Sequence, residues 1–203
     1  KLSLQNLGTP STVSAALGNT ANTTTITDDE SATLSIASTA SVTETGGAQS
    51  VGVTLTITGS GTGSLALGAG ISLTADVVDA GTGSATSADD YSAFGTQAVT
   101  FDNGAATGSV QNVTLSPVND RLLEGNETVG LTLQNLGKPS TVSAGLGNTT
   151  NTSTVTDDES ATLSIASTAS VMETGGAQSV GVSLTITGSG TGTFALGAGI
   201  ALT

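Results

Sequence analysis

The segment 49–58, QSVGVTLTIT, decides the fold class, because an apolar side chain stands at every second position. In an extended chain Val51, Val53, Leu55 and Ile57 would all point to one face, and the Thr and Gly residues to the other. β-Branched residues are favoured on such half-buried, pleated surfaces. We therefore predict a central β-strand with one face in a hydrophobic core.

The same pattern recurs outward from this segment in both directions. Six further strands are predicted, at residues 34–36, 71–77, 99–101, 113–115, 129–133 and 151–156. The turn signal Asp102-Asn103-Gly104 predicts that the strands at 99–101 and 113–115 form a hairpin. No stretch has helical spacing, so we predict an all-β fold, a seven-stranded antiparallel immunoglobulin-like β-sandwich.

The chain also repeats itself. Residues 1–74 recur as residues 130–203, a shift of 129, and 62 of the 74 aligned positions are identical. A repeat of this length exceeds that of solenoids and is long enough for each unit to bury its own core. We expect a window onto a tandem array, with residues 1–30 ending a preceding unit, 31–158 forming a complete unit and 159–203 beginning a following one.

Composition excludes several functions. Sixteen acidic residues against three basic ones give a net charge of −13, which would repel nucleic acid. The absence of Cys and His excludes disulfides, thiolate or imidazole metal sites and His-dependent triads. No apolar run approaches the ~18 residues of a membrane helix, so no membrane insertion of this segment is expected.

The acidic residues gather at the ends of predicted strands. The groups are Asp28-Asp29-Glu30 with Glu44, Asp89-Asp90, Asp120 with Glu124 and Glu127, and Asp157-Asp158-Glu159 with Glu173. In an antiparallel stack these strand ends can meet at one pole, where unpaired carboxylates repel one another. Ca²⁺ suits such a site because it accepts carboxylates, carbonyls and water in a tolerant geometry. The alternative is that acidic loops only keep the surface soluble.

Five motifs across the unit form a recognisable pattern. They are ATLSI at 32–36, VTETGG at 42–47, ADDY at 88–91, VNDRLLEGNETV at 118–129 and VTDDE at 155–159. Together they resemble the Calx-beta domain, the calcium-binding β-sandwich of sodium–calcium exchangers, which also occurs as tandem copies in large bacterial surface and extracellular proteins. The resemblance covers residues 33–159.

The resemblance implies Ca²⁺ at one end of the sandwich. The implied ligands are Glu44, Asp90, Asp120, the carbonyl of Leu122, Glu124, Asp157 and Asp158. Glu159 is a further candidate, whereas Glu127 also suits a solvent-facing strand position. Asn119 stands where the family has a carboxylate, which implies fewer ions or weaker binding.

The implied function is structural. Asp28 and Asp29 would close the site of a preceding unit, and Glu173 would open that of a following one. Because the closing acids run directly into the next strand, Ca²⁺ would brace the junction between adjacent repeats. We expect a stalk or fibre repeat of a bacterial extracellular or cell-surface protein such as an adhesin, with neighbouring repeats as its partners.

Three alternatives are open at this stage. Strand exchange between molecules would make the chain a homo-oligomer or filament subunit. A carbohydrate- or receptor-binding adhesin module would use the Gly-rich segments 58–70 and 79–87, although these lack aromatic and Arg anchors. Asp89 or Asp90 with Glu124 could serve glycoside hydrolysis. We expect no catalysis, because Tyr91 is the only Tyr or Trp and catalytic domains are seldom copied in tandem.

Overall fold

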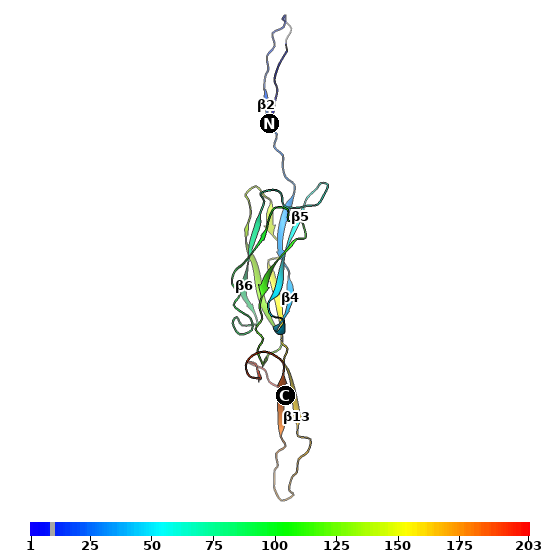
Figure 1. Cartoon of the computed structure of the whole chain (residues 1–203), viewed down its shortest axis with the longest axis vertical. Coiled ribbons are helices and arrows are strands. Elements are labelled where there is room, and N and C mark those ends of the chain that lie inside the picture. The colour runs from blue at the N-terminus through cyan, green and yellow to red at the C-terminus, as the bar shows by residue number, and fades with distance from the viewer. Residues whose placement is uncertain (9–10) are drawn as a thin grey trace.

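A computed structural model describes residues 1–8 and 11–203, and it places a β-sandwich between two extended terminal segments (Figure 1). One sheet has the strand order β4 (Thr39–Thr43), β12 (Thr150–Thr156), β10 (Glu127–Gly137), β6 (Leu73–Gly83) and β7 (Gln97–Phe101). The other has the order β11 (Ala144–Leu146), β3 (Ser31–Ile36), β5 (Gln49–Thr58) and β8 (Val110–Leu115). The predicted all-β sandwich is confirmed.

All seven predicted strands are present, and the sandwich has two further short strands, β4 and β11, that the alternation did not predict. The chain leaves β3 and enters β4, which pairs in parallel with β12, and β11 pairs in parallel with β3. The side chain of Asn151 holds this crossing, because its Nδ2 donates to the carbonyl of Ala37 at 2.7 Å and its Oδ1 accepts from the hydroxyl of Ser153 at 2.7 Å. The two sheets are therefore closed by parallel pairs, in an otherwise antiparallel sandwich.

The predicted hairpin of 99–101 with 113–115 is wrong. The turn is present, with Gly104 at φ 85°, but β7 pairs with β6 whereas β8 pairs with β5 in the other sheet. The intervening segment crosses between the sheets, and on the way it forms backbone hydrogen bonds with Leu65 and Leu67. A turn signal fixes the local bend and leaves the pairing partner undetermined.

The core is aliphatic, as the composition predicts. It is formed by the inward-facing residues of both sheets, and all of its buried members lie between Ala32 and Val155. The largest fully buried side chains include Phe101, Leu34, Leu55 and Leu133. Residues 31–156 thus contain the entire hydrophobic core of the described chain.

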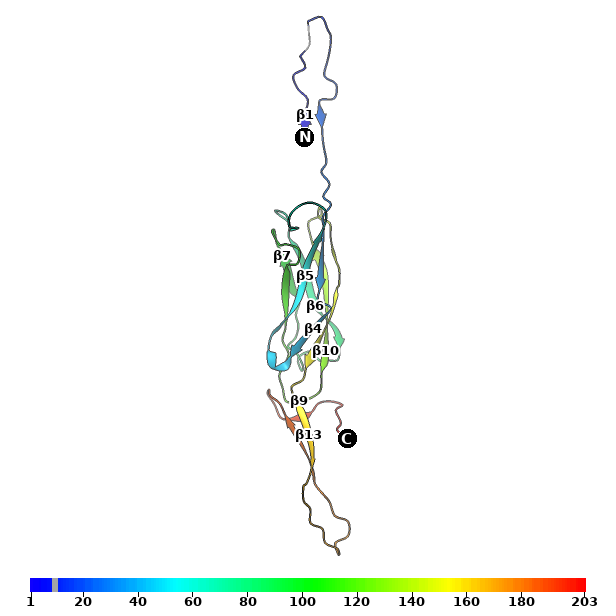
Figure 2. The same ribbon diagram turned by 90° about the vertical axis from the view of Figure 1, so that its right-hand side faces the viewer.

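The terminal segments extend from opposite poles of the sandwich (Figure 2). At one pole β1 (Leu2–Ser3) and β2 (Ala21–Asn22) form a thin ribbon; at the other β13 (Ser160–Ile165) and β14 (Val182–Thr187) form a hairpin, followed by β15 (Ala195–Leu196). Residues that are buried in the central unit are exposed in these copies: Ile36 is 2% exposed and its repeat counterpart Ile165 is 69% exposed. No helix in the described residues is long and apolar enough to span a membrane.

Candidate metal centre

Acidic residues from four connections meet at the pole from which the C-terminal hairpin extends, here called the acidic pole. Glu44 begins the short 3-10 helix η1 (Glu44–Gly46) between β4 and β5, and Asp90 lies between β6 and β7. Asp120 and Glu124 flank β9 (Leu122–Leu123), and Asp157 follows β12. Alternate ends of antiparallel strands lie at the same pole, which is why residues far apart in sequence converge here.

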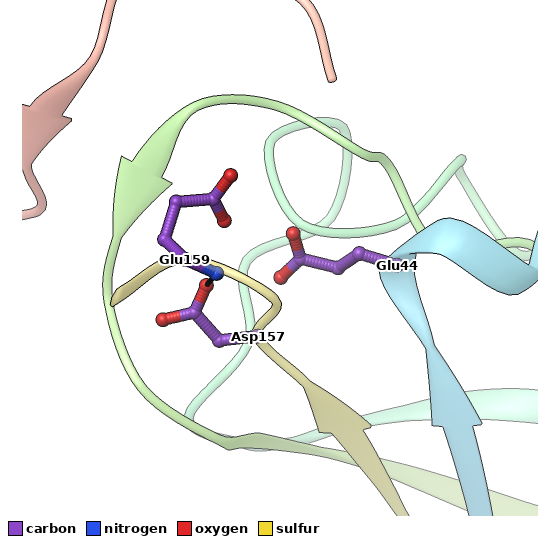
Figure 3. Close-up of side chains that lie close together, drawn as sticks. All are labelled: Glu44, Asp157 and Glu159. Atoms are coloured by element: carbon purple, nitrogen blue, oxygen red, sulfur yellow. Dashed lines mark hydrogen bonds between the residues drawn. The ribbon is translucent and has the colours of Figure 1, made fainter. Parts of the chain in front are cut away.

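One group, the junction cluster, consists of Glu44, Asp157 and Glu159 (Figure 3). A carboxylate oxygen from each lies within 4.8 Å of those of the other two. Glu44 and Glu159 are only 9% and 8% exposed, and Oε2 of Glu44 and both carboxylate oxygens of Glu159 are buried without a hydrogen-bond partner among the described residues. Unpaired buried acceptors are destabilising, so this cluster requires protons or a cation.

The electrostatics of the junction cluster support this view. Burial raises the pKa of Glu44 to about 8, and the negative charges of Asp157 and Glu159 add to the effect. Burial also raises the pKa of Glu159 to about 7, together with the neighbouring carboxylate of Asp157 and the charge of Asp158. Near neutral pH the two glutamates retain protons unless a cation takes their place.

Asp157 behaves differently because the backbone stabilises its charge. Burial alone would raise its pKa, but N–H groups of Gly125, Glu159 and Glu124 together hold the pKa below its ordinary value. Oδ2 accepts from Glu124 at 3.0 Å and from Gly125 at 2.7 Å, and Oδ1 accepts from Glu159 at 3.0 Å. Asp157 is thus an ionised, fixed anchor between the partly protonated glutamates.

A second group, the loop cluster, consists of Asp90, Glu124 and Glu127, whose carboxylate oxygens also lie within 4.8 Å of one another. Burial, a hydrogen bond to Asp90 and the charge of Asp90 raise the pKa of Glu127 to about 7. Burial followed by the charge of Asp90 raises the pKa of Glu124. The cluster lines an open pocket of about 540 Å³ to which Asp120 and Leu122 also contribute.

The structure brings most of the predicted ligands together, but in two groups. Glu44 and Asp157 belong to the junction cluster, and Asp90 and Glu124 to the loop cluster. Asp120 and Leu122 line the adjoining pocket, where Oδ1 of Asp120 accepts from the N–H of Leu122 at 2.7 Å. That all these residues bind metal stays a prediction.

Asp158 is engaged elsewhere. Its Oδ2 accepts from the N–H of Ser189 at 3.0 Å and from the Ser189 hydroxyl at 2.8 Å, in the following repeat. Asn119, the departure from the family pattern, donates from Nδ2 to the same hydroxyl at 3.1 Å. These two residues therefore contact the C-terminal segment, while Oδ1 of Asp158 remains buried without a partner among the described residues.

Two cluster members, Glu159 and Glu127, are not among the ligands that the family resemblance implies. Glu159 was only a further candidate and Glu127 an ambiguous strand residue, yet each lies in a cluster. Glu159 is buried and Glu127 is partly buried, and the V-T-D-D-E and E-x-x-E motifs were the sequence signals for these two residues. The flanking acids differ: Glu173 is exposed, and Asp29 accepts hydrogen bonds from the N–H and hydroxyl of Ser60.

No family model and no curated protein matches the chain. Among solved structures it is similar to the apo form of the Calx CBD1 domain, with 18% identity and a TM-score of 0.45 over 63% of this chain and 97% of that one.

Two further Calx structures are similar at the same level. The calcium binding domain CBD12 of CALX1.1 is 19% identical, with a TM-score of 0.43 over 62% of this chain and 44% of that one. The Calx CBD2 domain is 11% identical, with a TM-score of 0.44 over 62% of this chain and 86% of that one. At these identities the likeness concerns the fold alone.

Proposed function

We propose that this chain is a calcium-binding β-sandwich repeat of an extracellular or cell-surface protein, in which Ca²⁺ braces the junction between adjacent repeats. The observation that carries the proposal is the junction cluster: buried Glu44 and Glu159 hold unpaired carboxylate oxygens beside the ionised Asp157. A divalent cation would satisfy all three carboxylates at once and remove their mutual repulsion.

The chemistry of the donors favours Ca²⁺ over other cations. The side chains of both clusters offer carboxylate oxygens to a metal, and the chain holds no His or Cys to favour zinc or copper. Ca²⁺ accepts many oxygen ligands in flexible geometry, which suits clusters assembled from separate loops. Mg²⁺ demands a near-octahedral arrangement and keeps several waters, so it would use such a site less well.

The positions of the proposed ligands support the bracing role. Glu159 directly precedes β13, the first strand of the following repeat, whereas Glu44 belongs to the complete unit. A cation held by both would restrict the hinge between them. The near-identity of the repeats supports a spacer, since reach depends on copy number.

Thermal unfolding tests the proposal. Ca²⁺ binds only the folded state, so it should raise the Tm of the chain, with about 2.7 kcal/mol of added stability at a hundredfold excess over Kd. Glu44→Gln and Glu159→Gln should remove most of this shift. Glu173→Gln is the matched control, because Glu173 is the exposed repeat counterpart of Glu44 and should leave the shift intact. A Tm unchanged by Ca²⁺ in the parent chain would refute the proposal.

A second candidate is a filament subunit formed by strand exchange. The observation that favours it is the exposed apolar face of both terminal segments, including Leu4 at 59% and Ile165 at 69%. Self-association that increases with concentration in sedimentation velocity would support it. Carbohydrate binding is less favoured, because Tyr91, which could have offered an aromatic platform for a sugar, is only 4% exposed.

A further inference from the structure

At the acidic pole, the following repeat docks on the complete unit by strand addition. Its residues 191–197, the docking segment, lie along residues 119–123, the acceptor strip, and β15 pairs in parallel with β9. The N–H groups of Thr191, Ala195 and Gly197 donate to the carbonyls of Asn119, Arg121 and Leu123 at 3.2, 3.1 and 2.9 Å. The contact is thus made chiefly by main-chain groups.

Side chains fix the position of the docking segment. The guanidinium of Arg121 lies 4.9 Å from the ring centre of Phe194 and donates to the carbonyl of Gly192 at 3.2 Å. At Gly190 a Cβ atom would lie 1.9 Å from the carbonyl oxygen of Asp120. Only glycine permits this close approach, and its φ of 106° also lies in the region that favours glycine.

The complete unit carries the same docking segment at its opposite pole, without a partner. Residues 62–68, TGSLALG, are the repeat counterpart of residues 191–197, TGTFALG. Thr62, Ala66 and Gly68 correspond to the three junction donors; all three are exposed, and none of their N–H groups has a hydrogen-bond acceptor among the described residues. We call residues 62–68, which carry these three N–H groups, the free edge.

Strand geometry explains why this edge is available. Within the unit, the N–H of Leu67 donates to Ala105 and the carbonyl of Leu65 accepts from Thr107, both at 2.9 Å. Backbone groups alternate in direction along an extended chain, so the N–H of Ala66 points to the other side. Because of the same alternation, the N–H of Ala195 points toward the acceptor strip at the junction.

The surroundings of the free edge match the occupied junction except for the missing strip. Asp29 accepts from the N–H and hydroxyl of Ser60, as Asp158 does from Ser189. An open pocket of about 380 Å³ adjoins the edge. At Gly61, the counterpart of Gly190, an added Cβ would meet nothing within 4 Å. The docking side of the junction is therefore formed at this pole, and no acceptor strip lies against it among the described residues.

We propose that the free edge Thr62–Gly68 is a docking site for the acceptor strip, residues 119–123, of a second copy of this unit placed ahead of it in the same chain. Each unit then carries a donor edge at one pole and an acceptor strip at the other. Repetition of a single parallel contact would give a head-to-tail array with one fixed geometry. The contact uses main-chain hydrogen bonds and does not depend on the cation.

The test supplies the missing copy. Residues 31–130 of the sequence are placed ahead of Leu2, in place of Lys1, so that a complete unit precedes the existing one in register. Gly130 is included because a Cβ at this position would lie 2.1 Å from Oγ1 of Thr82. Amide hydrogen exchange is then measured by NMR in chelator. In the original unit, which now follows the added one, the exchange rates of the Thr62, Ala66 and Gly68 amides should fall by about tenfold or more relative to the parent chain.

Gly61→Ala provides the control in both chains. In the parent chain it should change only local exchange, because its Cβ meets nothing. In the lengthened chain it should return the three free-edge amides to their fast rates, since the Cβ would strike the counterpart of the Asp120 carbonyl. Gly190→Ala should likewise speed exchange at Thr191, Ala195 and Gly197 in either chain.

Two results would overturn the inference. The first is fast exchange at the free edge of the lengthened chain while Thr191, Ala195 and Gly197 remain protected. The second is an equal effect of Gly61→Ala in both chains. Because these measurements are made without Ca²⁺, their failure is separate from failure of the calcium-dependent Tm shift.

Discussion

The carboxylate of Asp157 accepts a hydrogen bond of 2.7 Å from the backbone N–H of Gly125, which ties the end of β12 to the loop that carries Glu124. The same carboxylate belongs to the junction cluster, whereas Glu124 belongs to the loop cluster. The side chain of Asp157 therefore links the junction cluster to the loop that carries part of the loop cluster.

Asp157→Asn should destabilise the chain even without Ca²⁺. An amide offers one acceptor oxygen, so the N–H groups of Gly125 and Glu159 can no longer both be satisfied. We expect a loss of about 1–3 kcal/mol in the free energy of unfolding. Urea denaturation measures it. Asp28→Asn alters the exposed repeat counterpart and should be nearly neutral; an equal loss in both variants would contradict this account.

Without cations, stability should fall as pH rises through the neutral range. The pKa of Glu44 is about 8 in the folded state against 4.5 ordinarily, so between these values the folded chain binds more protons than the unfolded chain. Glu159 and Glu127, each with a pKa of about 7, act in the same direction. Asp157 acts oppositely, but only below its ordinary value of 3.8.

The measurement is urea denaturation of metal-free protein at pH 5 and pH 8. The chain should be more stable at pH 5, and Glu44→Gln should reduce the difference because Gln does not titrate. Saturating Ca²⁺ replaces the protons, so its stabilising effect should grow with pH. Greater metal-free stability at pH 8 would show that the glutamates are not held in a protonated state.

Much of the fold could be predicted because alternation is a local property. Val51 and Val53 are adjacent in the pattern and lie on one buried face of β5. The short strands β4 and β11 could not be predicted, because each exists through parallel pairing with a strand far away in the sequence. The wrong hairpin prediction has the same cause, because strand pairing depends on packing across the whole core and not on the local turn.

The candidate site was partly predictable for a similar reason. Strand ends place Glu44 and Asp157 at one pole whichever way the loops fold. The separation into two clusters, and the engagement of Asp158 by Ser189, depend on loop conformation and on the following repeat. Sequence spacing contains no information on either.

Asn151→Ala should destabilise the sandwich, because it removes the side chain that holds the strand crossing. Asn151 is 3% exposed, and its loss would leave the carbonyl of Ala37 and the fully buried hydroxyl of Ser153 without their partner. We expect a loss of about 1–3 kcal/mol per buried group left unpaired, measured by urea denaturation. Asn22→Ala, at the exposed counterpart, should change stability little, and the prediction fails if the two variants behave alike.

Ca²⁺ should stiffen the joint between two complete units. In the lengthened chain Glu30 takes the place that Glu159 has here, between the closing acids of one unit and the first strand of the next. Small-angle scattering should show a larger radius of gyration and a narrower spread of dimensions in Ca²⁺ than in chelator, since a bridged joint bends less. Glu30→Gln should reduce the difference to what the unchanged joint at Glu159 contributes, whereas Glu173→Gln, remote from both joints, should preserve it in full. Identical scattering of the lengthened chain in Ca²⁺ and chelator would leave the sandwich able to bind calcium but would exclude a bracing role.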